Sequence, residues 1–135
     1  MDRRRVAAAA YAAALAGVTL IGWVPGLSDG DGRLFGVFRL TWYNDLLHLS
    51  SAAWAAVAAW WGLGASLVFL RVFGALYLLD GLMGLAIGSG YLDLGILVWG
   101  VQHLSLSFKL MANGPHIMLG SLALLAGFVL RPGSP

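Results

Sequence analysis

The feature that most restricts the fold of this chain is a set of long apolar runs that carry almost no charge. Residues 6–24 contain no charged side chain, and a run of roughly 20 such residues is what an α-helix needs to cross the hydrocarbon of a bilayer. Of the 135 residues, 60% are hydrophobic and 10% are charged, against about 25% charged in soluble domains. The chain is therefore predicted to be an all-α integral membrane protein, a single domain over residues 1–135, whose surroundings are the lipid bilayer.

Composition also excludes several kinds of function. The chain has no cysteine, so disulfides, zinc–thiolate sites, iron–sulfur clusters and thiol catalysis are ruled out. The net charge of +2 comes from scattered basic residues, which excludes a nucleic-acid-binding surface. The sequence contains no phosphate-binding loop, dinucleotide fingerprint, HExxH motif or nucleophile elbow, which disfavours an enzyme without deciding the question.

Four membrane spans are expected, at residues 6–24, 45–64, 67–88 and 115–131. The second helix is predicted to start at Asn44 or Asp45, because either side chain can accept from the free amides of a first turn. Pro115 is expected just inside the start of the last helix, where its missing N–H costs nothing. A turn-rich stretch at 25–33 and an aromatic stretch at 34–43 connect the first two helices, the latter expected along the membrane interface. Residues 89–112 form a second long connection.

An internal repeat supports this division. The stretch Asp45-Leu46-Leu47-His48 returns as Asn113-Gly114-Pro115-His116, 68 positions later. Two other landmarks recur in the same order, at offsets of 66 and 70 residues. The repeat predicts two tandem helix hairpins of the same orientation, residues about 5–65 and 71–131, which together make a four-transmembrane-helix bundle with interfacial outer segments.

The basic residues set the expected orientation. With four spans, one side of the membrane receives Arg3, Arg4, Arg5, Arg71 and Arg131, and the positive-inside rule makes that side cytoplasmic. Both termini are then cytoplasmic and both long connections face outward. Arg33, Arg39 and Lys109 lie in the outer connections against the rule.

Two other interpretations of the apolar segments are less consistent with the sequence. A fifth span at residues 91–107 is apolar enough to consider, but it contains Asp93, Gln102 and His103 and has no counterpart in the first half. A cleaved signal peptide at the N-terminus is disfavoured, because its apolar region usually runs about 7–15 residues. Four spans remain the expectation.

The motifs resemble those of a known family. A glycine-rich outer loop, the run Leu34-Phe35-Gly36-Val37-Phe38, an Asn or Asp shortly before His48, and the repeated Asn113-x-x-His116 are similar to a widespread family of small, four-span bacterial membrane proteins known only as a domain of unknown function. The resemblance covers nearly the whole chain, although Asp45 stands near where the family favours Asn. It implies a multi-pass protein of the bacterial inner membrane and supplies no activity, substrate or cofactor.

His48 and His116 are the first candidate site residues. The repeat brings equivalent positions toward one axis, where two facing imidazoles could ligate a haem iron or hold a divalent metal, with Asn44, Asp45 and Asn113 beside them. The simpler interpretation is structural, because a side chain three residues after a helix cap can bond back to the cap residue. Proton handling is a third possibility.

Asp80 is the second candidate. It lies nine residues beyond Arg71, about 13 Å along a helix and near mid-bilayer, where an ionisable group is costly and a functional candidate. No partner is evident from the sequence, because the histidines are expected nearer the outer surface. The alternative is a protonated Asp80 that is hydrogen-bonded within the bundle.

Three functions follow as hypotheses. The first is a non-enzymatic membrane protein that binds a small ligand, metal or haem at an outward-facing site formed by His48 and His116. The second is a structural or accessory subunit that forms a homo-oligomer or joins a larger membrane complex through glycine-lined faces. The third is a proton or ion pathway that uses Asp80 with the histidines.

Overall fold

The computed structural model describes residues 1–39 and 41–130, and over these residues the protein is all-helical, as expected. Its long helices are α1 (Arg3–Gly22), α2 (Trp42–Trp61), α3 (Leu63–Ile87) and α5 (Leu106–Val129). A two-residue-per-strand hairpin, β1 (Arg33–Leu34) and β2 (Phe38–Arg39), lies between α1 and α2, and the short α4 (Gly95–Trp99) lies between α3 and α5.

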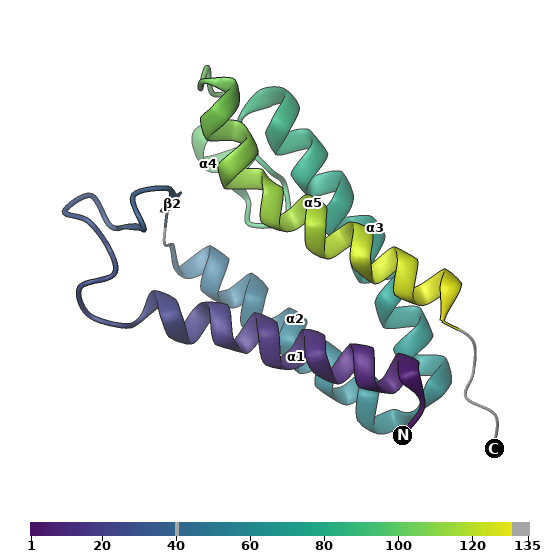
Figure 1. The fold of residues 1–135 in the computed structure, drawn as a ribbon. Helices are drawn as coiled ribbons and strands as arrows, with labels where there is room; N and C mark the ends of the chain where they lie inside the picture. Colours follow the sequence, from purple (N-terminus) through teal and green to yellow (C-terminus); the bar gives the residue numbers. More distant parts are fainter. Residues whose placement is uncertain (40, 131–135) are drawn as a thin grey trace.

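The long helices form two pairs (Figure 1). α1 packs along α2, and α3 packs along α5. The two long connections lie at one end of the bundle, and the N-terminus, the α2–α3 turn and the end of α5 lie at the other. At that second end, Arg4 Nε donates to the Leu130 carbonyl at 2.8 Å. This arrangement is the one that two tandem hairpins require, although the repeat itself remains a prediction.

Three helices of the described chain are long and apolar enough to cross a membrane: α1, α3 and α5. α2 has 20 residues and is about 30 Å long, but its first half carries Asn44, Asp45, His48 and two serines. The structure is therefore that of a helical protein with three candidate spans. Residues 91–107 contain the five-residue helix α4 and the first two residues of α5, and α4 is far too short to be a further span.

The predicted start of the second helix was wrong by about one turn. α2 begins at Trp42, and its cap is Thr41, whose side chain accepts from the Asn44 N–H at 3.4 Å. Asn44 and Asp45 thus lie within the first turn, where the positive end of the helix dipole stabilises the negative charge of Asp45. His48 is the seventh residue of α2, beyond the position from which it could complete a capping box.

The predicted start of the last helix was also wrong. Ser105 caps α5, accepting from the Phe108 N–H at 3.3 Å, so that Pro115 lies inside the helix rather than at its first turn. Proline in a helix interior removes one backbone hydrogen bond, which membrane helices tolerate when neighbouring helices support them. The earlier start carries His116 about 15 Å along α5 at 1.5 Å per residue. Arg131, assigned to the cytoplasmic side, lies outside the described residues.

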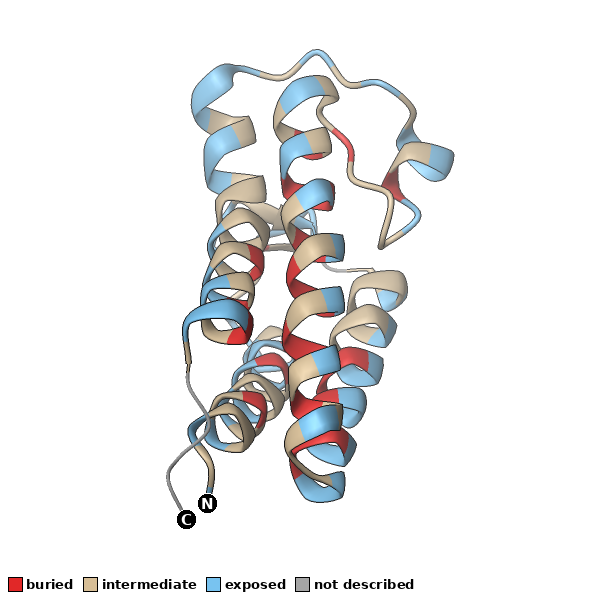
Figure 2. Ribbon diagram, turned by 90° about the vertical axis from the view of Figure 1, so that its right-hand side faces the viewer, coloured by how far each residue is buried: buried red, intermediate tan, exposed pale blue. Residues whose placement is uncertain are grey.

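The core is made of aromatic rings and close glycine contacts. Phe69, Phe73 and Tyr77 of α3 stack in series, with centroid separations of 4.9 and 4.0 Å. Gly74 and Gly120 let α3 and α5 approach each other: a Cβ at Gly120 would overlap the backbone of Leu78. Figure 2 shows the buried positions along the helix faces that meet inside the bundle. Since lipid is as apolar as leucine, such close packing is what holds membrane helices together.

Candidate functional site

A cavity of about 660 Å³ lies between the two helix pairs, on the side of the long connections. All of the residues singled out from the sequence as site candidates line it: Asn44, Asp45, His48, Asp80, Asn113 and His116. Its apolar walls come from α1, the hairpin and α5, and include Leu15, Val18, Phe38, Phe108 and Leu119. The volume is within the range of about 300–1,000 Å³ that small-molecule sites occupy.

The central contact of the site joins Asp80 of α3 to His116 of α5. His116 Nδ1 and Asp80 Oδ2 are 2.5 Å apart, and only 2% of Asp80 is exposed. The expectation that Asp80 has no histidine near it was wrong, because the early start of α5 places His116 at the depth of Asp80. A carboxylate on Nδ1 fixes the ring and leaves Nε2 for a ligand, as in carboxylate–histidine–metal arrangements.

The other oxygen of Asp80 holds the chain that follows α3. Asp80 Oδ1 accepts from the backbone N–H of Tyr91 at 2.7 Å and of Leu92 at 2.8 Å. A Cβ at Gly90 would lie 2.5 Å from Asp80 Oδ1, so only glycine allows this approach. Because Asp80 lies seven residues before the end of α3, the segment folds back about 10 Å along the helix. Two backbone N–H donors on one oxygen suit an ionised carboxylate.

His48 of α2 lies next to His116. Their ring centroids are 6.1 Å apart and the rings are nearly perpendicular, at 89°. The Tyr77 ring packs against the His116 ring, with a centroid separation of 4.8 Å. The Tyr77 hydroxyl lies 3.1 Å from Ser51 Oγ. The two helix pairs therefore meet at the imidazoles.

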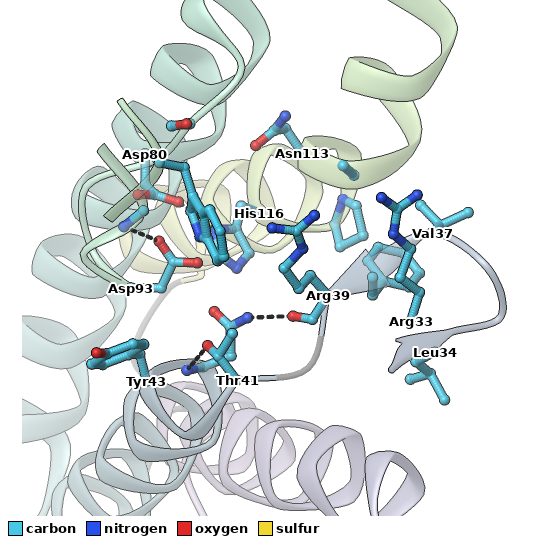
Figure 3. A pocket seen from close by; sticks show the side chains of 18 of the residues that line it. Arg33, Leu34, Val37, Arg39, Thr41, Tyr43, Asp80, Asp93, Asn113 and His116 are labelled. Carbon is cyan, nitrogen blue, oxygen red and sulfur yellow. Dashed lines mark hydrogen bonds and ion pairs between the residues drawn. The ribbon is translucent and has the colours of Figure 1, made fainter. Parts of the chain in front are cut away.

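The remaining candidates have structural partners. Asp45 Oδ2 accepts from Trp23 Nε1 at 2.9 Å, and Asn44 Nδ2 donates to the Arg39 carbonyl at 2.8 Å. Asn113 Nδ2 donates to the Lys109 carbonyl at 2.9 Å. These residues line the cavity while they fix the loops and helix ends around it, and Asn113 is seen on α5 in Figure 3.

Sequence reasoning missed two arginines. Arg33 and Arg39 of the hairpin line the cavity, and Figure 3 shows them on the α5 side of the hairpin, near Asn113 and His116. The signal was present, since both lie in an outer connection against the positive-inside rule. His103, read from the sequence as a loop residue, also lines the cavity.

Within residues 1–39 and 41–130 there is no group of three or more His, Cys, Asp or Glu side chains that could hold a metal ion. A bare ion would therefore have two imidazole ligands here.

In comparisons with known proteins, no family model, no curated protein and no solved structure matches this chain.

Proposed function

We propose that this protein is a four-span, non-enzymatic membrane protein that binds a haem-type metal complex between His48 and His116. The observation that carries the proposal is the pair of imidazoles at 6.1 Å at the base of a 660 Å³ cavity, one of them oriented by a buried carboxylate. Asp80 keeps the proton of His116 on Nδ1, so that Nε2 can coordinate.

The spacing of the rings fits one metal between them. A metal lies about 2.1 Å from a coordinating imidazole nitrogen, hence about 3 Å from the ring centre. Two imidazoles on one ion then have centroids about 5 Å apart in a tetrahedral site and about 6.5 Å apart when they are opposite each other. The observed 6.1 Å lies nearer to the opposed arrangement.

A metal that brings its own ligands suits this site better than a bare ion. Among the described residues, no third His, Cys, Asp or Glu joins these two imidazoles in a group that could hold a metal ion, whereas a haem iron needs only two axial ligands from the protein. The cavity also has the apolar walls that a porphyrin ring requires. The residues that would hold the group are His48 and His116, and the group would supply redox or gas-binding chemistry.

The direct test is a hemin titration of the purified protein in mild detergent, followed by the Soret band. Wild type should give a saturable, shifted band typical of two histidine ligands, and His48→Ala and His116→Ala should lose it. His103→Ala is the matched control, because it removes a third imidazole from the same cavity and should leave the spectrum unchanged. A wild-type Soret band that stays that of hemin in detergent alone would refute the proposal.

The proposal includes a membrane orientation, with both termini cytoplasmic and both long connections outside. Support comes from Arg3, the first residue of α1, and from Arg4, Arg5 and Arg71. The side chains of these last three donate to the carbonyls of Leu130, Ala59 and Gly127, at the end of the bundle opposite the long connections. Since the chain has no cysteine, single cysteines at Asp31, Gly64 and Gly100 can be labelled in intact cells with an impermeant maleimide. Labelling is expected at positions 31 and 100 and not at 64, and opposite labelling of 31 and 100 would exclude four spans.

A proton path through the bundle is disfavoured. Directly below the histidines, Tyr77, Phe73 and Phe69 fill the interior, each less than 3% exposed. Stacked aromatic rings offer no hydrogen-bonded relay toward the other end of the bundle. We therefore assign the polar groups near Asp80 to ligand binding in the cavity.

A further inference from the structure

The hairpin between α1 and α2 presents an unusual pair of like charges. Arg33 and Arg39 are direct partners in the β1–β2 register, so their side chains leave the same face, with Cβ atoms about 5 Å apart. Like charges directly opposite each other destabilise a strand pair. In a sheet of only two residues per strand, this repulsion has little else to offset it.

Neither guanidinium forms an ion pair within the described chain, although Asp31 lines a second pocket together with both arginines. Within the described chain, no carboxylate lies within salt-bridge distance of Arg33 or Arg39. Instead each packs on an aromatic ring of the second half: Arg39 Cζ is 4.2 Å from the Trp99 ring centre, and Arg33 Cζ is 5.8 Å from that of Phe108. Cation–π contacts position a guanidinium while leaving its N–H donors free.

The acidic residues of the cavity are engaged by other donors. Asp80 accepts from two backbone N–H groups and His116, Asp45 accepts from Trp23, and Asp93 Oδ1 accepts from the Gly95 N–H at 2.9 Å. The two arginines are thus the cavity's uncommitted charges, and their planar donors match carboxylates bidentately.

We infer that Arg33 and Arg39 form an anion clamp at the mouth of the cavity and bind the acidic substituents of the ligand. The inference rests on the proposed function for the identity of that ligand: a porphyrin with ionised carboxylates, whose ring lies in the cavity and whose acidic edge meets the hairpin. Binding would also relieve the repulsion between the arginines, so the ligand would stabilise the hairpin across the gap between the two helix pairs.

The test compares three probes: hemin, hemin dimethyl ester and metal-free protoporphyrin IX. Wild type should bind hemin at least tenfold more tightly than the ester, because only hemin carries carboxylates. Arg33→Gln and Arg39→Gln should each weaken the binding of hemin by about tenfold, as expected for the loss of one charge-assisted contact. The double variant should bind hemin and its ester equally.

Lys109→Gln is the matched control. This variant removes one positive charge from the same side of the protein. Lys109 does not line the cavity, and its Nζ donates to the Ala86 carbonyl at 3.1 Å. Hemin affinity should remain within about twofold of wild type.

Metal-free protoporphyrin separates the clamp from the iron ligands. Its fluorescence should report binding that survives His116→Ala and is lost in Arg33→Gln/Arg39→Gln. Equal affinity of wild type for hemin and its ester would overturn the clamp and leave the histidine proposal standing. Protoporphyrin bound through the arginines, with no hemin Soret shift, would overturn iron ligation and leave the clamp.

Discussion

The side chain of Asp80 ties together three parts of the protein, so replacing it should reveal how the site is built. Its oxygens accept from the Tyr91 and Leu92 N–H groups and contact His116 Nδ1, at 2.7, 2.8 and 2.5 Å. In Asp80→Ala both backbone donors lose their acceptor. An orphaned donor costs about 1–3 kcal/mol, and since these bonds are only partly buried we take the lower half of that range. The expected loss of unfolding free energy is about 2–4 kcal/mol.

Asp80→Asn should behave differently. Its oxygen can keep both backbone donors, so the loss should be about 1–2 kcal/mol, the difference between charge-assisted and neutral hydrogen bonds. Its NH₂ group then faces His116 Nδ1 and forces the imidazole proton to Nε2. The amide cannot turn over, because NH₂ would then face the N–H groups of Tyr91 and Leu92. Hemin binding should therefore fall sharply while the fold persists.

The assays are denaturant unfolding in mild detergent, followed by tryptophan fluorescence, and hemin titration of the same samples. Asp93→Ala is the control, since Asp93 lines the same cavity but accepts one N–H, from Gly95 at 2.9 Å, and should cost about 1 kcal/mol. Hydrogen exchange at residues 88–92 should rise in Asp80→Ala and not in Asp93→Ala. If Asp80→Ala and Asp80→Asn lose equal stability, or if Asp80→Asn keeps full hemin affinity, the reasoning is wrong.

Three further predictions concern packing. Gly120→Ala should lose about 1–3 kcal/mol in the same unfolding assay, because its Cβ would overlap the α3 backbone. Gly17→Ala, inside α1 and with open space around it, should be neutral or gain up to about 1 kcal/mol; equal losses in both variants would contradict the close packing. Tyr11→Phe should lose about 0.5–1.5 kcal/mol, since Tyr11 Oη donates to the Leu119 carbonyl at 2.6 Å between α1 and α5; no loss would show that this bond contributes nothing.

Much of the fold could be predicted from the sequence, because membrane helices are fixed by local properties. A run of apolar residues must form a helix in lipid to satisfy its own backbone, so the long helices fall close to their predicted positions. The two helix starts that were wrong, at Thr41 and Ser105, show the limit of this reasoning. Asn and Asp are good helix caps, but so are the Thr and Ser that lie one to two turns earlier. Only tertiary packing decides which of these residues caps the helix.

The sequence alone determined that the chain is helical and apolar, has no cysteine, and carries His48 and His116 at a spacing of 68 residues. Tertiary structure decided that His116 meets Asp80, and that Arg33 and Arg39 reach the same cavity from a hairpin that is 75 and 60 residues away in sequence from their aromatic partners, Phe108 and Trp99. The physical reason is that depth along a helix depends on where it begins, and contacts between helices depend on how glycines let them approach. Neither is encoded in any short stretch of residues.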